Sequence, residues 1–538
     1  MVWKRKLPHL KYLFFLYFVI VIVSSLLLFS PWTQNENNQI SYIDAVFTTA
    51  SAFSDTGLVV VNTFEHWNWF GQAIIAVLIL SGGIGIFALK FFIINYLFGK
   101  KSATLSEVKL LQTERGSDDP VRTTRLVINS VKFLFLSIFI FSIILTVYFY
   151  FSGPKMTVAI QNELANNYIN PKGDIVMSLR FGIFHTISAI NNAGFDIISG
   201  NSLMPYYSDY FLQVCFIILL IIGGLGYPAI YDIRQYIRHK IRKRKNKYHF
   251  SLFTKVSLTF YLLIFLVGFV WTLINETTSI AGDTLFNKLA LNNTNSLSFQ
   301  EQIKLKILMD QWNFNMFKSG EPVSKENIEF FKAHTISYYG TTFNKVFAIF
   351  FTSLSTRSAG FATANLNDFT KASKLVYTIM MVIGSAPAST GGGIRTTTFA
   401  VFMMSIISTL LGQPRIRMFK RAINKDTVFQ SLLVVAIALV ILTIGVLLSI
   451  TSLNSHTETG INARNFGSEA IIFEVASAFG TTGLSTGITT QLNTLSKITI
   501  IVVMFIGQFG ISSTLLVWKR KKDNKRKFEY IDGDLAIG

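Results

Sequence analysis

Long apolar stretches alternate with short polar ones along the whole of this 538-residue chain. Eight of the stretches carry few charged residues, and each is long enough for a helix to cross ~30 Å of hydrocarbon. The pattern therefore predicts eight transmembrane helices. They are residues 12–30, 69–98, 127–151, 210–231, 256–274, 375–411, 427–452 and 497–518.

A shorter apolar stretch lies between the first and second members of each pair of predicted spans. None is long enough to cross a bilayer, so each is interpreted as a pore helix that enters only half of the membrane. Ser41 stands three residues before Asp44, a spacing that resembles a capping box at the start of the first such helix. The four pore helices are expected at about 42–53, 180–190, 344–355 and 468–479.

A glycine-centred loop follows each predicted pore helix, and its sequence recurs four times. A phenylalanine stands ten residues before each glycine, a small residue directly precedes the glycine, and a large apolar residue follows it. One such match would indicate only a turn, whereas four in one chain indicate a repeat architecture. The copies read FTTASAFSDTGL, FHTISAINNAGF, FFTSLSTRSAGF and FEVASAFGTTGL, ending at Leu58, Phe195, Phe361 and Leu484.

Composition and charge agree with a multi-pass protein of the cell membrane. Hydrophobic residues make up 51% of the chain and charged residues 14%, which is unlike a soluble domain. The net charge of +20 gathers in segments 4–6, 100–125, 234–247, 415–425 and 519–527. The positive-inside rule places these segments, and both termini, in the cytoplasm. Because every basic cluster adjoins a span and lacks interleaved aromatics, anionic lipid is the expected partner and nucleic acid is not.

These features predict an all-α polytopic membrane protein built from four span–pore helix–loop–span units with pseudo-fourfold symmetry around a central pore. The middle interval between glycines is longer because of a polar insertion, which is expected to face outward. The units are residues 1–99, 100–245, 246–412 with the insertion at about 275–342, and 413–538 with a basic cytoplasmic tail.

The chemistry of the repeated loops suits a bare cation. Backbone carbonyl oxygens aimed at one axis can replace the hydration shell of an ion. Glycine permits the backbone angles that such a run of carbonyls requires, and the carboxyl end of a half-helix adds negative potential at the axis. The alternative is that the loops only pack helices together, which would not explain their fourfold recurrence.

A second glycine-rich cluster recurs in each return span, where small residues favour close helix packing. The copies begin at Ser81, Gly223 and Gly507, but the third reads GSAPASTGGGIRTTT from Gly384. Its proline, glycines and hydroxyl groups would break a helix, and such backbone is costly against lipid. It is therefore interpreted as a mobile gate in the ion path, with a static packing defect as the alternative.

Taken together, the four loops, the NNAGF and RSAGF cores and the SAPASTGGGIRTTT segment resemble the Trk/Ktr/HKT superfamily of potassium transporters, in particular the membrane subunit of bacterial Trk/Ktr systems. The resemblance covers nearly the whole chain except the insertion. It implies potassium uptake, with sodium as a possible coupling or activating ion. It also implies a homodimer with a cytoplasmic nucleotide-binding ring of the RCK/KTN type, and no covalent cofactor.

The resemblance further assigns residues to a filter and a gate. Gly57 favours potassium, because plant-type relatives that favour sodium carry serine there. The potassium-binding filter residues are Asp55, Thr56, Gly57, Leu58, Asn192, Ala193, Gly194, Phe195, Ser358, Ala359, Gly360, Phe361, Thr481, Thr482, Gly483 and Leu484. The gate residues are Ala388, Ser389, Thr390, Gly391, Gly392, Gly393, Arg395 and Gln508.

Two positions depart from the expected pattern or extend it. The family usually has a pore-facing arginine in the fourth return span, where this chain has Gln508, so an electrostatic barrier would be absent. Asp55 places a carboxylate in the first filter loop, either as a hydrogen-bond acceptor for loop backbone or as a direct influence on the outer ion site.

A polytopic enzyme or a secondary carrier is the competing functional class. Either would need titratable groups at membrane depth, and the spans offer almost none. His185 and Glu474, each one residue after the repeated phenylalanine, are the nearest candidates and are expected instead to anchor their pore helices. With a single cysteine, Cys215, the chain can form no internal disulfide. The sequence therefore favours a transporter over an enzyme.

Overall fold

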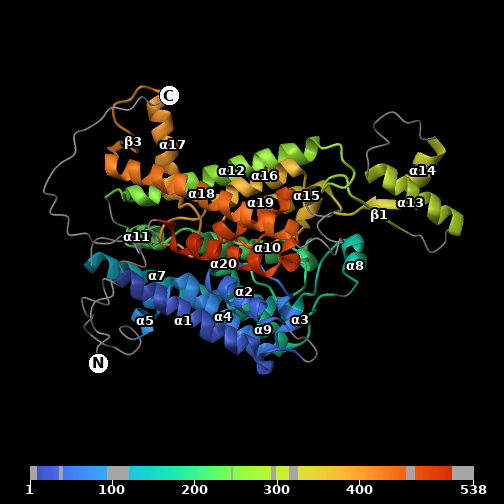
Figure 1. Cartoon of the computed structure of the whole chain (residues 1–538), viewed down its shortest axis with the longest axis horizontal. Helices are drawn as coiled ribbons and strands as arrows, with labels where there is room; N and C mark the ends of the chain where they lie inside the picture. Colours follow the sequence, from blue (N-terminus) through green and yellow to red (C-terminus); the bar gives the residue numbers. More distant parts are fainter. Residues whose placement is uncertain are drawn as a thin grey trace.

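The computed structural model consists almost entirely of helices (Figure 1). Its described part contains two small antiparallel sheets of two strands each. The predicted basic segments 4–6 and 519–527, most of 100–125, and both chain ends lie outside the described residues. The structure describes residues 9–35, 40–93, 120–165, 167–243, 246–292, 298–313, 325–455 and 467–511.

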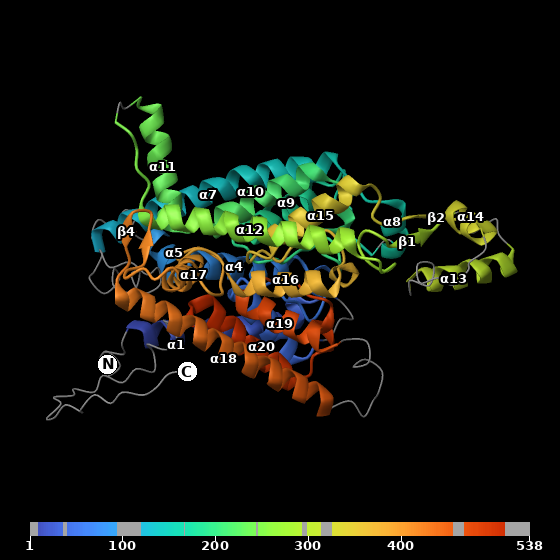
Figure 2. The same cartoon turned by 90° about the horizontal axis from the view of Figure 1, so that it is seen from above.

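A long leading helix opens each of the four units, and in the described residues these are the helices that can cross a membrane without a break. They run roughly along the long axis of the molecule (Figure 1), and α7 and α18 lie on opposite sides of the bundle (Figure 2). Many of their large apolar side chains are exposed, as expected for a surface that faces lipid. The leading helices are α1 His9–Phe29, α7 Pro120–Phe151, α12 Leu252–Thr278 and α18 Lys425–Ser455.

The four predicted pore helices are present, and each packs against the leading helix of its own unit. The first begins at its predicted residue because the Ser41 hydroxyl accepts a bond from the Asp44 backbone N–H at 3.3 Å. Lys497 then pairs with Asp44 at 2.6 Å and ties this helix to the fourth unit. The second helix starts five residues before the prediction. The pore helices are α2 Tyr42–Phe53, α9 Ile175–Ile190, α15 Thr342–Ser355 and α19 Ser468–Gly480.

The return spans are broken, which corrects the prediction of continuous helices over 69–98 and 210–231. Gly85 and Gly226 adopt positive φ angles of 88° and 77°, which side-chain-bearing residues resist. The second break bends the chain by 108°. The return helices are α4 Trp69–Ile84 with α5 Ile86–Phe92, α10 Tyr210–Gly224 with α11 Tyr227–Ile241, α16 Lys371–Val382 with α17 Thr396–Leu410, and α20 Thr494–Phe509.

Short elements lie in the loops between the long helices. Helices α3 Thr63–His66 and α8 Val158–Leu164 lie in loops that follow a filter loop and a leading helix respectively. Strands β3 Arg417–Met418 and β4 Arg421–Ala422 form a hairpin between α17 and α18.

The polar insertion forms a small lobe apart from the helical bundle (Figure 2). Strand β1 Leu289–Leu291 pairs antiparallel with β2 Thr335–Ser337, with Ala290 opposite Ile336. Between the strands, α13 Phe299–Asn313 and α14 Lys325–Ala333 pack around a small core of Leu305, Leu308 and Phe331. The lobe has its own core, so it adds a separate feature without interrupting the bundle.

Candidate ion-conduction site

The four repeated loops share one backbone conformation. Each loop leaves its pore helix through a residue in the left-handed region and reaches its glycine two residues later, again with positive φ. Only glycine adopts that second conformation without strain. The φ angles are 51° at Asp55 and 84° at Gly57, 56° at Asn192 and 68° at Gly194, 70° at Ser358 and 77° at Gly360, and 46° at Thr481 and 86° at Gly483.

The four loop glycines form a closed ring in the order of the repeats. A methyl group built on any of them would lie against the Cα atom of the next glycine, so no side chain fits at these positions. Measured from the added methyl carbon to the Cα atom of the next glycine, the distance is 3.0 Å for Gly57 to Gly194, 2.9 Å for Gly194 to Gly360, 3.3 Å for Gly360 to Gly483, and 2.9 Å for Gly483 to Gly57. The structure thus brings together loops that are more than a hundred residues apart.

Each loop is fixed by a buried side chain, and three of the four are also fixed by a backbone hydrogen bond that reaches five residues back into the pore helix. The large residues Leu58, Phe195, Phe361 and Leu484 are buried, at no more than 1% exposure. The backbone N–H groups of Thr56, Ala193 and Thr482 each donate to the carbonyl five residues earlier, at 2.8 to 2.9 Å. The side chains that follow the glycines therefore serve as anchors, which leaves the backbone to define the centre.

His185 and Glu474 anchor their pore helices, as the sequence predicted. His185 contacts the Phe181 carbonyl through Nδ1 at 2.8 Å, and its Nε2 accepts from the Ile197 N–H at 3.3 Å. Glu474 accepts a hydrogen bond from the Thr489 hydroxyl. Both contacts link a pore helix to the chain beyond its filter loop.

An outer cavity of about 250 Å³ opens directly above the glycine ring, and all four ring glycines line it. Among the described residues that line this cavity, Asp196 is the one acidic residue. Its Oδ1 accepts from the N–H groups of Ile198 and Ser199 at 3.1 and 3.2 Å. Burial raises the pKa of the Asp196 carboxyl to about 6, and these two backbone donors oppose the shift.

The sequence reasoning did not single out Asp196. A signal was available, because the second loop is the one copy in which an acid follows the large apolar residue: Val59, Ala362 and Ser485 stand at the equivalent positions. Asp55, which the sequence reasoning did consider, does not line the outer cavity. It is fully buried, and its Oδ2 accepts from the Gln508 side chain at 3.3 Å.

The glycine-rich break of the third return span lies against the third and fourth glycine loops and two other return spans. Its backbone makes hydrogen bonds with the second and fourth units. They join Gly392 N–H to the Thr481 hydroxyl at 2.7 Å, Gly393 N–H to the Gly507 carbonyl at 3.2 Å, Thr390 N–H to the Gly223 carbonyl at 3.3 Å, and Tyr227 N–H to the Ala388 carbonyl at 3.0 Å.

Gln508 of the fourth unit and Arg395, which directly follows the glycines of this segment, hold the segment in place. The Gln508 amide donates to the Thr390 carbonyl at 3.1 Å as well as to Asp55. Arg395 donates to the carbonyl oxygens of Gly391 and, at 2.8 Å, Gln508. Gln508 therefore bridges the first filter loop and the glycine-rich segment.

A buried arginine that the sequence reasoning left unassigned supports the start of the same segment. Arg357 is 1% exposed and donates to the carbonyls of Ile383 and, at 2.8 Å, Gly384. Its guanidinium also lies 5.0 Å from the centre of the Tyr261 ring. Because it binds backbone carbonyls, this charge is satisfied away from the glycine ring.

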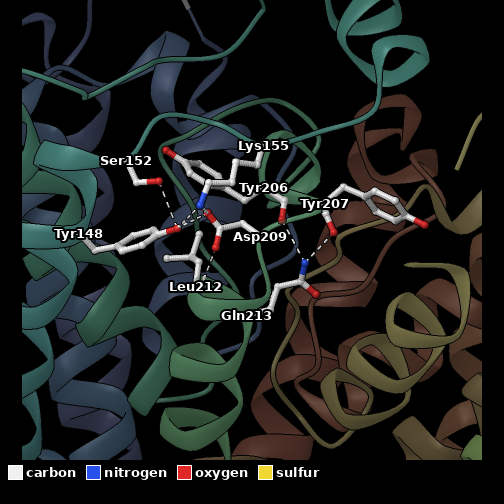
Figure 3. A network of polar contacts seen from close by, with 8 residues as sticks. All are labelled: Tyr148, Ser152, Lys155, Tyr206, Tyr207, Asp209, Leu212 and Gln213. Atoms are coloured by element: carbon white, nitrogen blue, oxygen red, sulfur yellow. Dashed lines mark hydrogen bonds and ion pairs between the residues drawn. The ribbon is translucent and has the colours of Figure 1, made fainter. Parts of the chain in front are cut away.

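A polar network fixes the outer end of the second unit (Figure 3). Asp209 accepts from the Tyr148 hydroxyl and lies 3.4 Å from the Lys155 ammonium. Gln213 donates to the carbonyls of Tyr206 and Tyr207 at 3.0 and 2.8 Å. The network joins α7 to the start of α10 and holds the loop that follows the second filter copy.

Comparisons with known proteins agree with this architecture. The family described as TrkH: Cation transport protein matches residues 15–530. The Ktr system potassium uptake protein D of Bacillus subtilis is 30% identical, over 94% of this chain and 92% of its own. The potassium/sodium uptake protein NtpJ of Enterococcus hirae is 26% identical, over 97% and 95%.

A solved structure shares the fold. The potassium transporter TrkH from Vibrio parahaemolyticus aligns with 96% of this chain and 86% of its own, with a TM-score of 0.57 and 16% identity. The family match spans nearly the whole chain and includes all four repeats. The competing assignment to a polytopic enzyme is thereby set aside, and this chain belongs to the TrkH family of cation transport proteins.

Proposed function

We propose that this chain carries potassium into the cell through the ring formed by its four glycine loops. The observation that carries the proposal is the closed ring itself, in which four distant segments adopt the same conformation around one centre. Two relatives are named as potassium or potassium/sodium uptake proteins. Sodium would then act as a coupling or activating ion.

In this proposal, the filter loops bind the ion through backbone oxygens. The carbonyls nearest the ring belong to Thr56, Ala193, Ala359 and Thr482, which directly precede the four glycines. Such carbonyls replace water around a dehydrated cation, and the carboxyl ends of the four pore helices add favourable potential. The other residues of the four loops, 55–58, 192–195, 358–361 and 481–484, shape and anchor this backbone.

Cations would enter through the outer cavity. Asp196 supplies a negative charge there, with Oδ1 bonded to backbone and the carboxylate lining the cavity. A charge in such a narrow mouth raises the local concentration of cations. Asp196 is therefore assigned to attracting cations into the cavity rather than to selecting potassium over sodium.

The segment from Ala388 to Gly393 would gate the path below the filter. It is held by hydrogen bonds that a modest movement could exchange, including those from Arg395 and Gln508. Its contact with Thr481 places it directly against the fourth filter loop. Opening would require the segment to leave that position.

We extend the proposal to the assembly. The chain would form a homodimer in the cell membrane with both termini in the cytoplasm, bound there to a nucleotide-binding ring of the RCK/KTN type. One relative, from Bacillus subtilis, is named as a potassium uptake protein of a Ktr system. In this proposal the four units keep the boundaries predicted from the sequence, and the insertion at about 275–342 faces outward.

Rubidium flux into liposomes that contain the purified chain tests the proposed function. We expect uptake that potassium inhibits more strongly than sodium does at equal concentration. Protein-free liposomes and liposomes containing heat-unfolded protein are the controls. Uptake no greater than in these controls, from protein that is folded and correctly inserted, would overturn the proposal.

A further inference from the structure

The second return span changes direction sharply at its lower end. After Gly226 the chain bends by 108°, so α11 leaves the direction of the spans at close to a right angle (Figure 2). The bend lies on the side of the basic loops, which the positive-inside rule places in the cytoplasm. A helix in this position runs along the membrane surface.

The sequence of α11 suits such an interfacial position. Ile230, Ile233, Ile237 and Ile241 recur at helical spacing, and basic residues occupy much of the remaining surface of its second half. Ile230 is buried, but Ile237 and Ile241 are 50% and 74% exposed, so the protein leaves the second half of this apolar stripe uncovered. Basic amphipathic helices bind at the boundary between headgroups and acyl chains.

A largely apolar cavity of about 350 Å³ lies where α11 meets α7 and α10. Its apolar lining comes from all three helices, and two arginines of α11 complete it. The combination of an apolar chamber with cationic groups matches an amphiphile, whereas a free phosphate ion would need no apolar wall. The lining residues are Phe133, Ile222, Leu225, Ile230, Ile233, Arg234, Ile237 and Arg238.

Neither arginine has a carboxylate partner among the described residues, and Arg234 is held in place by another helix. Arg234 donates to the Asn129 side chain at 2.7 Å, which holds its guanidinium beside α7. The nearest acid in sequence, Asp232, accepts instead from the Ser251 N–H and the Thr254 hydroxyl at the start of α12. Across the part of the chain that the structure describes, no ion pair joins an acid to Arg234 or Arg238.

We propose that this cavity binds one anionic phospholipid. An acyl chain would occupy the apolar chamber, and the headgroup phosphate would accept hydrogen bonds from Arg234 and Arg238. Guanidinium groups match phosphate oxygens in geometry as well as in charge. The cavity lies at the depth where a span gives way to an interfacial helix, which is where headgroup and acyl chain meet.

This lipid site is connected to the glycine-rich segment by direct bonds. Tyr227, the first residue of α11, donates its N–H to Ala388 at 3.0 Å, and Gly224 accepts from Ala386 at 3.2 Å. The Tyr227 hydroxyl donates to the Ile84 carbonyl at 2.8 Å, next to the break of the first return span. A lipid that holds α11 in place would therefore stabilise the present position of the segment, and this part rests on the proposed function.

Lipid retention in native mass spectrometry tests the site without measuring transport. Phosphatidylglycerol is titrated into the detergent-solubilised chain, with phosphatidylcholine as the zwitterionic comparison. The double variant R234Q/R238Q should bind phosphatidylglycerol about 25-fold more weakly, at about fivefold for each arginine. The matched control K240Q/K243Q removes the same charge from the same region outside the cavity and should bind as the wild type does.

Equal phosphatidylglycerol binding by the two double variants would overturn the proposal. The single variant R238Q guards against misfolding, because Arg238 is exposed and makes no bond to Asn129; it should lose about fivefold. Competition by millimolar inorganic phosphate alone would point to a soluble anion and overturn the lipid assignment. If R234Q/R238Q loses a bound second copy of the protein but keeps the lipid, this face of α11 is a protein contact. That outcome would also overturn the lipid proposal.

Rubidium flux then tests the connection to the gate. Wild-type flux should differ at least twofold between liposomes of phosphatidylcholine alone and liposomes with added phosphatidylglycerol, and R234Q/R238Q should lose that difference. Identical wild-type flux in the two membranes, with phosphatidylglycerol bound, would overturn the connection and leave the site standing. Absence of flux in both membranes would instead count against the proposed function.

Discussion

Two layers of glycine in this protein have similar backbone angles and different surroundings. The upper layer is the ring of Gly57, Gly194, Gly360 and Gly483, where every glycine is pressed against the backbone of the next loop. The lower layer is formed by the glycines that break the return spans: Gly85, Gly226, Gly393 and Gly510 have φ angles of 88°, 77°, 75° and 81°. There, a methyl group on Gly226 would meet the Pro387 carbonyl at 2.5 Å, whereas one on Gly510 would meet nothing within 4 Å.

The contrast suggests how one fold can hold a selective element and a mobile one. Selection by backbone oxygens needs several equivalent groups around one centre, and the upper layer is uniform. A gate needs one unit that differs from the others, and in the lower layer the third unit replaces a single glycine by a long break between Val382 and Thr396. Changes to the two layers should therefore have different consequences.

The largest effect is expected from Gly57→Ser in the upper layer. A side chain there must fit against the Cα of Gly194 and adopt a φ of 84°, so the ring must deform. We expect potassium-over-sodium discrimination in flux assays to fall at least about tenfold, which corresponds to only about 1.4 kcal/mol between the two ions. Measurement of rubidium and sodium flux in the same liposome preparation gives this ratio.

Gly412→Ser is the matched control, because Gly412 has a φ of 61° but no atom near its missing side chain. It should retain the wild-type ion preference. Unchanged discrimination in a folded Gly57→Ser protein would count against the filter assignment and would remove the distinction between the layers.

Deletion of residues 388–393 addresses the lower layer. The segment bonds to Thr481 and to the return spans of the second and fourth units, so its removal should clear the path below the filter. We expect rubidium flux to rise about tenfold, because removing the gate increases the fraction of protein whose path is open. The ion preference should stay the same. Lower flux in a folded, surface-expressed deletion variant would contradict the gate role.

Much of this arrangement could be predicted from the sequence, because local patterns carry it. The pore helix at Tyr42–Phe53 was predicted to the residue, since its apolar run is bounded by Ser41 and by the loop that contains Gly57. The pairing of the loops into a ring followed from their fourfold recurrence. These features depend on periodicity and turn chemistry, which a single sequence displays directly.

Other features depend on contacts between distant segments, and the sequence could not supply them. The side chain of Asp55 could not be placed until its bond to Gln508, far along the chain, was seen. Arg357 could face the pore or turn away, and only the carbonyls of Ile383 and Gly384 decide it. The breaks at Gly85 and Gly226 were interpreted as packing positions because a glycine in an apolar run is compatible with either role.

Gln508 lies at the junction of the two layers, and Gln508→Arg should have a smaller effect than Gly57→Ser or the deletion of residues 388–393. A unit charge ~6 Å from a potassium ion is worth roughly 3 kcal/mol at an effective dielectric constant of about 20. Water and the neighbouring Asp55 carboxylate would offset much of it, so we expect flux to fall about three- to tenfold with selectivity unchanged. Steady rubidium flux and thermal stability are measured together, because an arginine buried between helices would instead destabilise the protein.

Gln302→Arg, an exposed position on α13, is the charge-matched control and should leave flux unchanged. A stable Gln508→Arg protein with wild-type flux would show that this residue lies away from the ion path. Its bonds to Thr390 and Asp55 would then serve only to hold the two loops together.

The smallest effect is expected from Asp196→Asn, which alters the mouth above the upper layer and leaves the ring intact. The amide keeps an oxygen to accept from Ile198 and Ser199 and removes the negative charge from the cavity. We expect the rubidium KM to rise roughly threefold, with maximal flux and ion preference unchanged, because the filter carbonyls are untouched. Asp310→Asn on exposed α13 removes the same charge at a distance and should have no effect.

The pH dependence of the KM sharpens this last test. Because the pKa of Asp196 is raised to about 6, its carboxyl is ionised at pH 7.5 and becomes largely protonated as the pH falls to 5. The wild-type KM should therefore rise over that interval toward the Asp196→Asn value, while the variant's KM stays flat. A variant that keeps the wild-type pH response would assign the titration to another group, and the outer cavity would then act through its shape rather than through the charge of Asp196.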